Sequence, residues 1–254
     1  MLLKNLIKNI PQAKKKIKIS GLSTDSRKVK KNYIFFAIKG NENNGEVFIN
    51  EAIKKGASVI VCSKKYNFKH KDILVIKKNN VRNFLSQVSS KFFKYKPKNI
   101  FAVTGTNGKT SVADIFYQLL TINKIPASSI GTLGVKYNNN ILKTDLTTPS
   151  TILIHKYLND LKKKGIDNVI IEASSHGLEQ NRLHNINFKA GIFTNFSQDH
   201  LDYHKSMKAY LNSKLILFNE NLNNKSKIIS DDEIKPFNQL KKIAKKKKYK
   251  NIRN

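Results

Sequence analysis

The chain has 254 residues, of which 48 are lysine or arginine and 17 are aspartate or glutamate, giving a formal net charge of +31. This length allows about two domains with buried cores. Such a positive charge would favour binding to nucleic acid. However, the lysines are spread along the whole chain with few aromatic residues between them, so we do not expect a nucleic-acid partner. The same positive field would favour an anionic substrate such as a nucleotide.

Cysteine usage and the lack of long apolar runs point to the cytoplasm. The single cysteine, Cys62, lies in an apolar run and has no second cysteine for an internal disulfide, which suits a reducing compartment. No apolar run reaches the roughly 20 residues that cross a bilayer. Residues 1–16 also lack the pattern of a signal peptide. We therefore expect a cytoplasmic protein without a membrane partner.

Residues 17–98 alternate short apolar runs with helical patterns. The expected strands are 33–38, 57–62 and 72–76. A helix is expected between the first two strands, where apolar residues recur at helical spacing, and another at 81–93. Proline and lysine then interrupt the pattern at 94–99. The sequence predicts a small α/β domain over residues 1–97.

Residues 98–254 form a second α/β pattern. The expected strands are 99–105, 167–175, 189–197 and 225–232, and the expected helices are 109–123, 151–165 and 210–222. This alternation predicts a largely parallel sheet with helices on both faces. Ligands bind such sheets at the carboxyl ends of the strands. Three polar loops fall at that edge: 104–110, 172–180 and 195–204.

The first of these loops, TGTNGKT, is similar to a phosphate loop but is shortened. The usual loop has four residues between its first glycine and the Gly-Lys pair, whereas Gly105 stands three positions before Gly108. A glycine-rich turn between a strand and a helix presents backbone N–H groups to an anion. Lys109 would contact the β- and γ-phosphates, and the Thr110 hydroxyl would bind Mg²⁺. The sequence therefore predicts ATP and Mg²⁺ as ligands.

Five segments together resemble one family. The loop resembles the ATP loop of the Mur ligases and of the related folylpolyglutamate synthases. Residues 23–58 resemble the UDP-binding domain that two Mur ligases share. The sequences LTTPS, IIEASSHGLEQNR and TNFSQDHLDYHKSMKAYLNSKLILF resemble the Mur ligases that form the tripeptide. The resemblance extends in order over about residues 20–235.

The resemblance implies an ATP-dependent, amide-forming ligase of peptidoglycan synthesis. Its substrates would be UDP-MurNAc-L-Ala-D-Glu and a diamino acid, either meso-diaminopimelate or L-lysine. ATP would phosphorylate the terminal carboxylate, and the amine would attack the resulting acyl phosphate. Phosphoryl transfer needs mainly positioning and charge neutralisation, which Lys109 and Mg²⁺ would provide.

The resemblance also implies roles for individual residues. The catalytic residues would be Lys109, Glu172, His200 and Lys214. The ATP loop would comprise Gly105, Thr106, Asn107, Gly108, Lys109, Thr110 and Ser111. The Mg²⁺ ligands would be Thr110, Glu172, His200 and Lys214. The substrate would contact Thr24, Ser26, Asn41, Glu42, Asn43, Thr147, Thr148, Ser174, Gln180 and Arg182.

An unmodified Lys214 ammonium would repel Mg²⁺. The resemblance implies that Lys214 is carbamylated instead, which makes it an anion that can bind the metal. His176 is expected to have a structural role, and the role of His204 stays open. Two positions depart from the family pattern: Ser150 stands where an acidic residue is common, and Thr24 stands where an apolar residue is usual.

The family pattern continues beyond the end of this sequence, through the rest of the ATP domain and a third domain that binds the amino acid. We therefore expect a fragment or the product of a truncated or split gene, inactive alone, with a separate chain as one source of the missing domain. Two other interpretations remain. One is a neighbouring Mur ligase or a folylpolyglutamate synthase, and the other is a basic, non-catalytic module that binds nucleic acid through its lysine-rich end.

Overall fold

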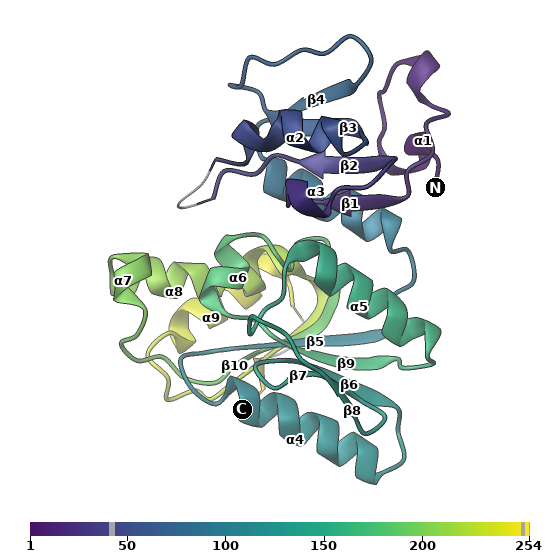
Figure 1. Cartoon of the computed structure of the whole chain (residues 1–254). Helices are drawn as coiled ribbons and strands as arrows, with labels where there is room; N and C mark the ends of the chain where they lie inside the picture. The colour runs from purple at the N-terminus through teal and green to yellow at the C-terminus, as the bar shows by residue number, and fades with distance from the viewer. Residues whose placement is uncertain (41–43, 250–251, 254) are drawn as a thin grey trace. The chain divides into compact units, whose positions relative to one another are not determined.

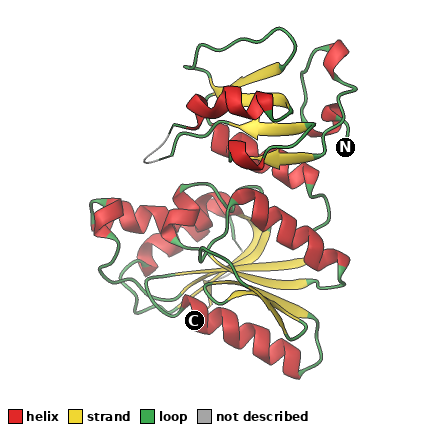
Figure 2. Cartoon of the chain, in the orientation of Figure 1, coloured by secondary structure: helices red, strands yellow, loops and turns green. Residues whose placement is uncertain are grey.

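The computed structural model describes residues 1–40, 44–249 and 252–253. The chain forms two compact units, Met1–Phe92 and Phe93–Asn254. Each unit combines strands and helices, as Figures 1 and 2 show. The predicted α/β class is therefore confirmed. The division between the units lies slightly before the boundary expected at residues 97 and 98.

Unit 1 is built on a four-stranded parallel sheet with the strand order β1-β2-β3-β4. The strands are β1 (Gly21–Ser23), β2 (Tyr33–Phe36), β3 (Ala57–Ser63) and β4 (Leu74–Lys78). The middle strands are rich in β-branched and aromatic residues, which favour a buried sheet. Phe35, Ile60 and Cys62 are fully buried in its core. Cys62 is a free, buried thiol, so packing accounts for it.

The helices of unit 1 are short except for α3. They are α1 (Leu3–Leu6), α2 (Ile49–Lys54) and α3 (Val81–Phe92), and three 3₁₀ turns accompany them: η1 (Gln12–Lys14), η2 (Ser26–Lys28) and η3 (Gly45–Phe48). Asp25 caps η2 by accepting a hydrogen bond from the backbone N–H of Arg27. The segment expected as one helix before β3 is thus divided into η3 and α2.

Unit 2 contains an eight-stranded sheet with the strand order β12-β11-β10-β5-β9-β6-β7-β8. Its strands are β5 (Asn99–Thr104), β6 (Ala127–Gly131), β7 (Gly134–Tyr137), β8 (Asn140–Leu142), β9 (Asn168–Glu172), β10 (Phe188–Phe193), β11 (Leu222–Ser230) and β12 (Ile252–Arg253). All neighbouring pairs are parallel except β6–β7 and β7–β8. The largely parallel sheet is as predicted.

Helices cover both faces of this sheet (Figure 1). They are α4 (Lys109–Ile122), α5 (Thr151–Lys163), α6 (Ser175–Glu179), α7 (Leu201–His204), α8 (Met207–Ile216) and α9 (Phe237–Lys247), and a π-helical turn, η4 (Leu217–Asn221), follows α8. Side chains alternate along β5: Ile100 and Ala102 join the core beneath α5, α6 and α9, whereas Phe101 and Val103 pack with α4. One strand thus contributes to two cores.

The order of the elements brings three turns to one edge of the sheet. The connection from β5 to α4, the end of β9 and the segment after β10 all follow the carboxyl ends of parallel, neighbouring strands. This edge is where a doubly covered parallel sheet binds its ligands. In the described parts of the chain, no helix has the combined length and apolar character required to cross a membrane.

Candidate active site

The phosphate-loop segment needs glycine at two positions. Gly105 has a φ of +149°, and a Cβ there would lie 1.9 Å from Thr194 Oγ1. Gly108 has a φ of +81° and is the N-cap of α4. A residue with a side chain would be strained at either position. The shortened loop is therefore a defined turn that presents the amino end of α4, which is suited to an anion.

Residues that follow β10 form hydrogen bonds to this loop. Asn195 Oδ1 accepts from Asn107 N at 2.9 Å, and Asn195 Nδ2 donates to Asn107 O at 3.2 Å. Thr194 Oγ1 donates to the same carbonyl oxygen at 2.6 Å. The Thr106 hydroxyl donates to Ser197 O at 3.1 Å and accepts from Ser197 N at 3.0 Å. The side chain of Thr106, expected in the ATP loop, is thus engaged in bracing that loop.

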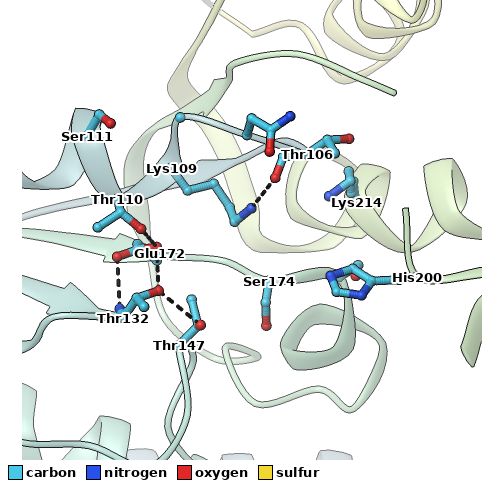
Figure 3. A pocket seen from close by; sticks show the side chains of 13 residues that line it. Thr106, Lys109, Thr110, Ser111, Thr132, Thr147, Glu172, Ser174, His200 and Lys214 are labelled. Carbon is cyan, nitrogen blue, oxygen red and sulfur yellow. Dashed lines mark hydrogen bonds between the residues drawn. The ribbon is translucent and has the colours of Figure 1, made fainter. Parts of the chain in front are cut away.

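Two lysine ammonium groups donate to one carbonyl oxygen of the loop. Lys109 Nζ lies 2.9 Å from Gly105 O, and Lys214 Nζ lies 2.7 Å from the same atom. Lys109 also donates to Thr106 O at 2.7 Å. Lys214, from α8, is only 1% exposed and lies 4.2 Å from the ring centroid of Tyr210. These lysines come from distant parts of the chain and meet at the loop (Figure 3).

Burial and mutual repulsion affect the charge of these lysines. Burial, and next the positive charge of Lys109, lower the pKa of Lys214 to about 7. Burial also lowers the pKa of Lys109, which Glu172 and Asp199 partly oppose. A neutral amine is accordingly accessible at Lys214 near neutral pH.

Glu172 ends β9 with its carboxylate held on several sides. The residue is 2% exposed. Thr110 Oγ1 donates to Oε2 at 2.8 Å, and Thr132 donates to Oε1 from its backbone N–H at 2.9 Å and to Oε2 from its hydroxyl at 3.2 Å. A Cβ on Gly131 would lie 1.9 Å from Oε1. The carboxylate is therefore fixed beside the first turn of α4 (Figure 3).

The substrate residues expected in unit 2 lie around Thr148, which is 1% exposed. Its hydroxyl donates to Glu172 O at 2.7 Å and accepts from Ser174 N at 2.9 Å. Arg182 Nη1 donates to Thr148 O at 2.7 Å, and Arg182 Nη2 donates to Gln180 Oε1 at 2.8 Å. The Ser174 hydroxyl caps α6 by accepting from Gly177 N. These bonds attach the 143–150 segment to the end of β9.

His200 begins α7 in the left-handed region, with a φ of 51°. Its Nε2 lies 3.5 Å from Asp199 Oδ2, and its ring meets that of His176 edge to face at a centroid separation of 5.0 Å. His204 is buried, and its Nδ1 lies 3.4 Å from Glu179 Oε2. Ten non-glycine residues of the described chain have a positive φ, so the position of His200 beside the loop, and not its backbone conformation, associates it with the site.

One cavity of about 250 Å³ joins most of these groups. Its lining comprises Thr106, Asn107, Gly108, Lys109, Thr110, Ser111, Thr132, Thr147, Glu172, Ser174, Ser175, His200 and Lys214. Eleven of these thirteen are expected site residues, and Figure 3 shows the side chains of the lining. Gly105, Thr148, Gln180 and Arg182 are absent from the lining. Thr132, Thr194 and Asn195 were not predicted, because threonine and asparagine carry no sequence signal of their own in this composition.

A second cavity, of about 420 Å³, lies in unit 1. It is lined by Thr24, Asp25, Ser26, Arg27, Phe48 and Glu51. The Ser26 hydroxyl donates to Glu51 Oε2 at 2.6 Å, and Arg27 forms an exposed ion pair with Asp25. Thr24 and Ser26 therefore line a common cavity. The other expected residues of this subsite, Asn41, Glu42 and Asn43, lie outside the described residues.

The donor set beside the loop fits one Mg²⁺. Glu172 supplies a buried anionic oxygen, and the Thr110 hydroxyl is adjacent to it. Within the described ranges, no three His, Cys, Asp or Glu side chains gather as a metal cluster. Mg²⁺ commonly takes one or two protein oxygens and completes its shell with phosphates and water, so this arrangement suits it. The unmodified Lys214 ammonium does not fit as a ligand.

The sequence matches the Mur ligase middle domain over residues 103–254, and the catalytic domain of the Mur ligase family over residues 18–93. The chain belongs to the Mur ligase family. The UDP-N-acetylmuramoyl-L-alanyl-D-glutamate--2,6-diaminopimelate ligase of Wigglesworthia glossinidia brevipalpis is 43% identical over 236 residues, which cover 90% of this chain and 47% of that ligase. The ligase of the same name from Clostridium tetani is 39% identical over 249 residues, 96% of this chain and 50% of the ligase.

Solved structures of Mur ligases share this fold. A ligase of that same name superposes with a TM-score of 0.83 at 26% identity, covering 98% of this chain and 51% of the other. A MurF ligase from Thermotoga maritima, solved in complex with ADP, has a TM-score of 0.56 at 19% identity, covering 89% of this chain and 48% of the other. The chain spans about half the length of the curated relatives it matches.

Proposed function

We propose that the chain provides the nucleotide-binding and phosphoryl-transfer part of a ligase that adds a diamino acid to UDP-MurNAc-L-Ala-D-Glu. Unit 1 would bind the UDP portion, and unit 2 would bind ATP. One observation carries the proposal: a single cavity is lined by the phosphate loop, Glu172, Lys214 and the hydroxyls of Thr147 and Ser174. The names and identities of the relatives support the same reaction.

The chemistry begins with transfer of the γ-phosphoryl group to the terminal carboxylate of the dipeptide. Lys109 would exchange the carbonyls of Gly105 and Thr106 for phosphate oxygens, and the N–H groups at the start of α4 would face the same anion. A carboxylate is a poor acyl donor, whereas an acyl phosphate has a good leaving group. The amine of meso-diaminopimelate or L-lysine would then form the amide bond and release phosphate.

Mg²⁺ would be held by Thr110 and Glu172. His200 and a carbamylated Lys214, which line the same cavity, would be the other ligands. When bound, the ion would neutralise phosphate charge. Thr147, Thr148, Ser174, Gln180 and Arg182 would hold the muramoyl peptide. Arg182 would act in part from outside the cavity lining, through its bond to Thr148 O.

The modification of Lys214 has a physical basis in its surroundings. A neutral amine attacks CO₂, forming an N–C bond while one C=O electron pair moves to oxygen and a proton leaves the nitrogen. The product is a carbamate anion. Burial and Lys109 lower the pKa of Lys214 to about 7, which favours the neutral amine that this step requires.

In unit 1, the cavity beside Thr24 and Ser26 would hold the uridine, and residues 41–43 would contact the UDP. We further propose a cytoplasmic location, consistent with nucleotide substrates and the free thiol of Cys62. Since the relatives are about twice as long, a segment or separate chain corresponding to their second half would complete the enzyme.

The decisive experiment joins this chain to the second half of the Clostridium tetani relative and supplies ATP, Mg²⁺, UDP-MurNAc-L-Ala-D-Glu and either diamino acid. Mass spectrometry should detect the tripeptide with one of the two amines, together with stoichiometric ADP. The 254-residue chain is assayed in parallel for binding of a fluorescent ATP analogue and for product, and we expect binding without tripeptide. Failure of the chain to bind ATP and of the fusion to form product would contradict the proposal.

A further inference from the structure

Thr132 lies between the end of β6 and the start of β7, and it contacts both sides of the cavity. Its backbone N–H donates to Glu172 Oε1 at 2.9 Å, and its hydroxyl lies 3.2 Å from Glu172 Oε2. The same hydroxyl lies 3.0 Å from Thr147 Oγ1. Figure 3 shows Thr132 between these two residues. It is thus the link between the carboxylate and the 143–150 segment.

The direction of this hydrogen-bond chain follows from the chemistry of the groups. An ionised carboxylate only accepts, so the single hydroxyl proton of Thr132 is directed to Glu172. Thr132 Oγ1 must then accept the proton of Thr147. The sequence of donors runs from Thr147 through Thr132 to Glu172, and the Thr110 hydroxyl donates to the same carboxylate from α4.

The neighbouring backbone leaves Glu172 little freedom. A Cβ on Gly131 would lie 1.9 Å from Glu172 Oε1, so the carboxylate packs directly against the end of β6. Gly131 O accepts from Thr144 Oγ1 at 3.2 Å, which joins the strand end to the same 143–150 segment. The pair Gly131-Thr132 therefore orients the carboxylate and is joined to the 143–150 segment.

We propose that Thr132 is a positioning residue that sets the orientation of the Glu172 carboxylate for a nucleotide-bound divalent cation and couples it to Thr147. This inference rests on the proposed function, since it assigns Thr132 to the metal and substrate sides of that same site. Partners of a metal-binding carboxylate typically affect metal affinity by about 10- to 100-fold. Thr132 Oγ1 is one of three hydrogen-bond donors to the carboxylate, so we expect the lower end of that range.

The test compares Thr132→Val with the unaltered 254-residue chain. Valine has nearly the same shape as threonine and keeps the backbone N–H, but it lacks the hydroxyl. Thr132 is exposed and does not belong to the hydrophobic core. We expect Mn²⁺·ATP affinity, measured from the free Mn²⁺ signal in electron paramagnetic resonance, to fall about tenfold. ATP affinity in the presence of a chelator should stay within about twofold, because Lys109 and the loop are unchanged.

Three further variants make the result specific. Thr132→Ser retains a hydroxyl and should recover most of the Mn²⁺·ATP affinity. Thr121→Val removes a hydroxyl that donates to Tyr117 O within α4 and should have no effect. Thr147→Val should weaken binding of UDP-MurNAc-L-Ala-D-Glu severalfold, and Thr132→Val should weaken it in the same direction.

The outcomes separate this inference from the proposed function. If the unaltered chain binds neither ATP nor Mn²⁺·ATP, the proposed function fails. If it binds both and Thr132→Val has the affinity of the unaltered chain for Mn²⁺·ATP, the role of Thr132 is overturned while the function stands. An equal loss of ATP affinity with and without metal, with an unchanged circular dichroism spectrum, would also overturn the role of Thr132, because the hydroxyl would then act on the loop.

Discussion

Two regions of unit 2 hold a lysine with a lowered pKa, and they differ in what surrounds it. Lys96 Nζ donates to Phe93 O at 2.7 Å and lies 3.1 Å from His155 Nδ1. Lys214 Nζ donates to Gly105 O, also at 2.7 Å. Burial lowers the pKa of Lys96 to about 8 and is the main cause of lowering that of Lys214 to about 7. The carbonyl contact and the lowered pKa are therefore common to both regions.

What distinguishes them is the rest of the neighbourhood. Lys96 faces a buried imidazole, and this pairing attaches the segment before β5 to α5. Lys214 instead lines a cavity with a carboxylate, a phosphate-binding turn and a second cation. A lowered lysine pKa thus reports burial, and convergence of chemically complementary groups is what points to function. The predictions below test that distinction, beginning with the largest expected effect.

Replacing Lys214 should affect turnover far more than replacing Lys96. In the completed fusion enzyme, we expect Lys214→Ala to lower tripeptide formation by about 100-fold or more, as removal of a preorganised charged group commonly does. Added acetate should partly restore turnover by supplying the missing carboxylate. Lys96→Ala serves as the matched control and should keep most of the parental rate. Equal rates for the two variants would remove the distinction between the regions.

Lys109 should contribute to ATP binding through contacts with the phosphates. We expect Lys109→Ala to weaken ATP binding by roughly 1.5–3 kcal/mol, the range for a hydrogen bond to a charged group, and to leave adenosine binding nearly unchanged. Calorimetry with ATP, ADP and adenosine would measure this dependence on phosphate number. Parallel losses for ATP and adenosine in a folded variant would argue that Lys109 supports the loop alone.

The buried His155 beside Lys96 should contribute to the pH dependence of the free energy of unfolding. Burial, and next the charge of Lys96, lower the pKa of the fully buried His155 to about 3. The unfolded chain takes up a proton below about 6.5, and the folded chain does so only near 3. Stability should therefore fall as the pH decreases from 6.5 towards 3, by about 2 kcal/mol between pH 7 and 5 from this residue.

Urea unfolding of the chain at pH 7, 6 and 5 would measure that contribution. His155→Leu should have a shallower pH dependence than the unaltered chain, whatever its stability at pH 7. The same slope in both proteins would show that His155 is protonated in the folded state or is exposed to solvent.

The smallest expected effect concerns the bracing of the phosphate loop. Asn195→Ala removes two hydrogen bonds to the backbone of Asn107, each worth about 1 kcal/mol. We expect a severalfold loss of ATP affinity and a melting temperature lowered by a few degrees. Asn99→Ala, which removes a bond to Asn168 at the other end of β5, is the control. A parental ATP affinity in Asn195→Ala would show that Asn107 needs no support.

The sequence was informative wherever local pattern decides structure. Apolar runs located β2, β3, β5 and β9, and the turn TGTNGKT located the amino end of α4. The antiparallel β6–β8 ribbon was missed because its strands are short and polar. Asn138 and Asn139 carry the available signal: both have positive φ, at 44° and 61°, and such a pair favours a tight hairpin. His200 and Lys214 were located by motif resemblance, since their types alone say little in a lysine-rich chain.

Other parts of the site could not have been read from the sequence. The bonds from Asn195 to Asn107 and from Thr132 to Glu172 join residues that are distant in the chain, so they arise only when parallel strands align. Likewise, the pKa of Lys214 depends on burial and on Lys109, neither of which a linear motif contains.

Because Gly131 has no side chain, it limits which substitutions this site can accept. Every genetically encoded substitution at this position adds a Cβ, which would occupy space that the Glu172 carboxylate fills. The position contributes no functional group, yet a substitution there would force the Glu172 carboxylate to move from its hydrogen-bonded position. A position at the end of a strand, without any side chain of its own, is thereby restricted by the carboxylate packed against it.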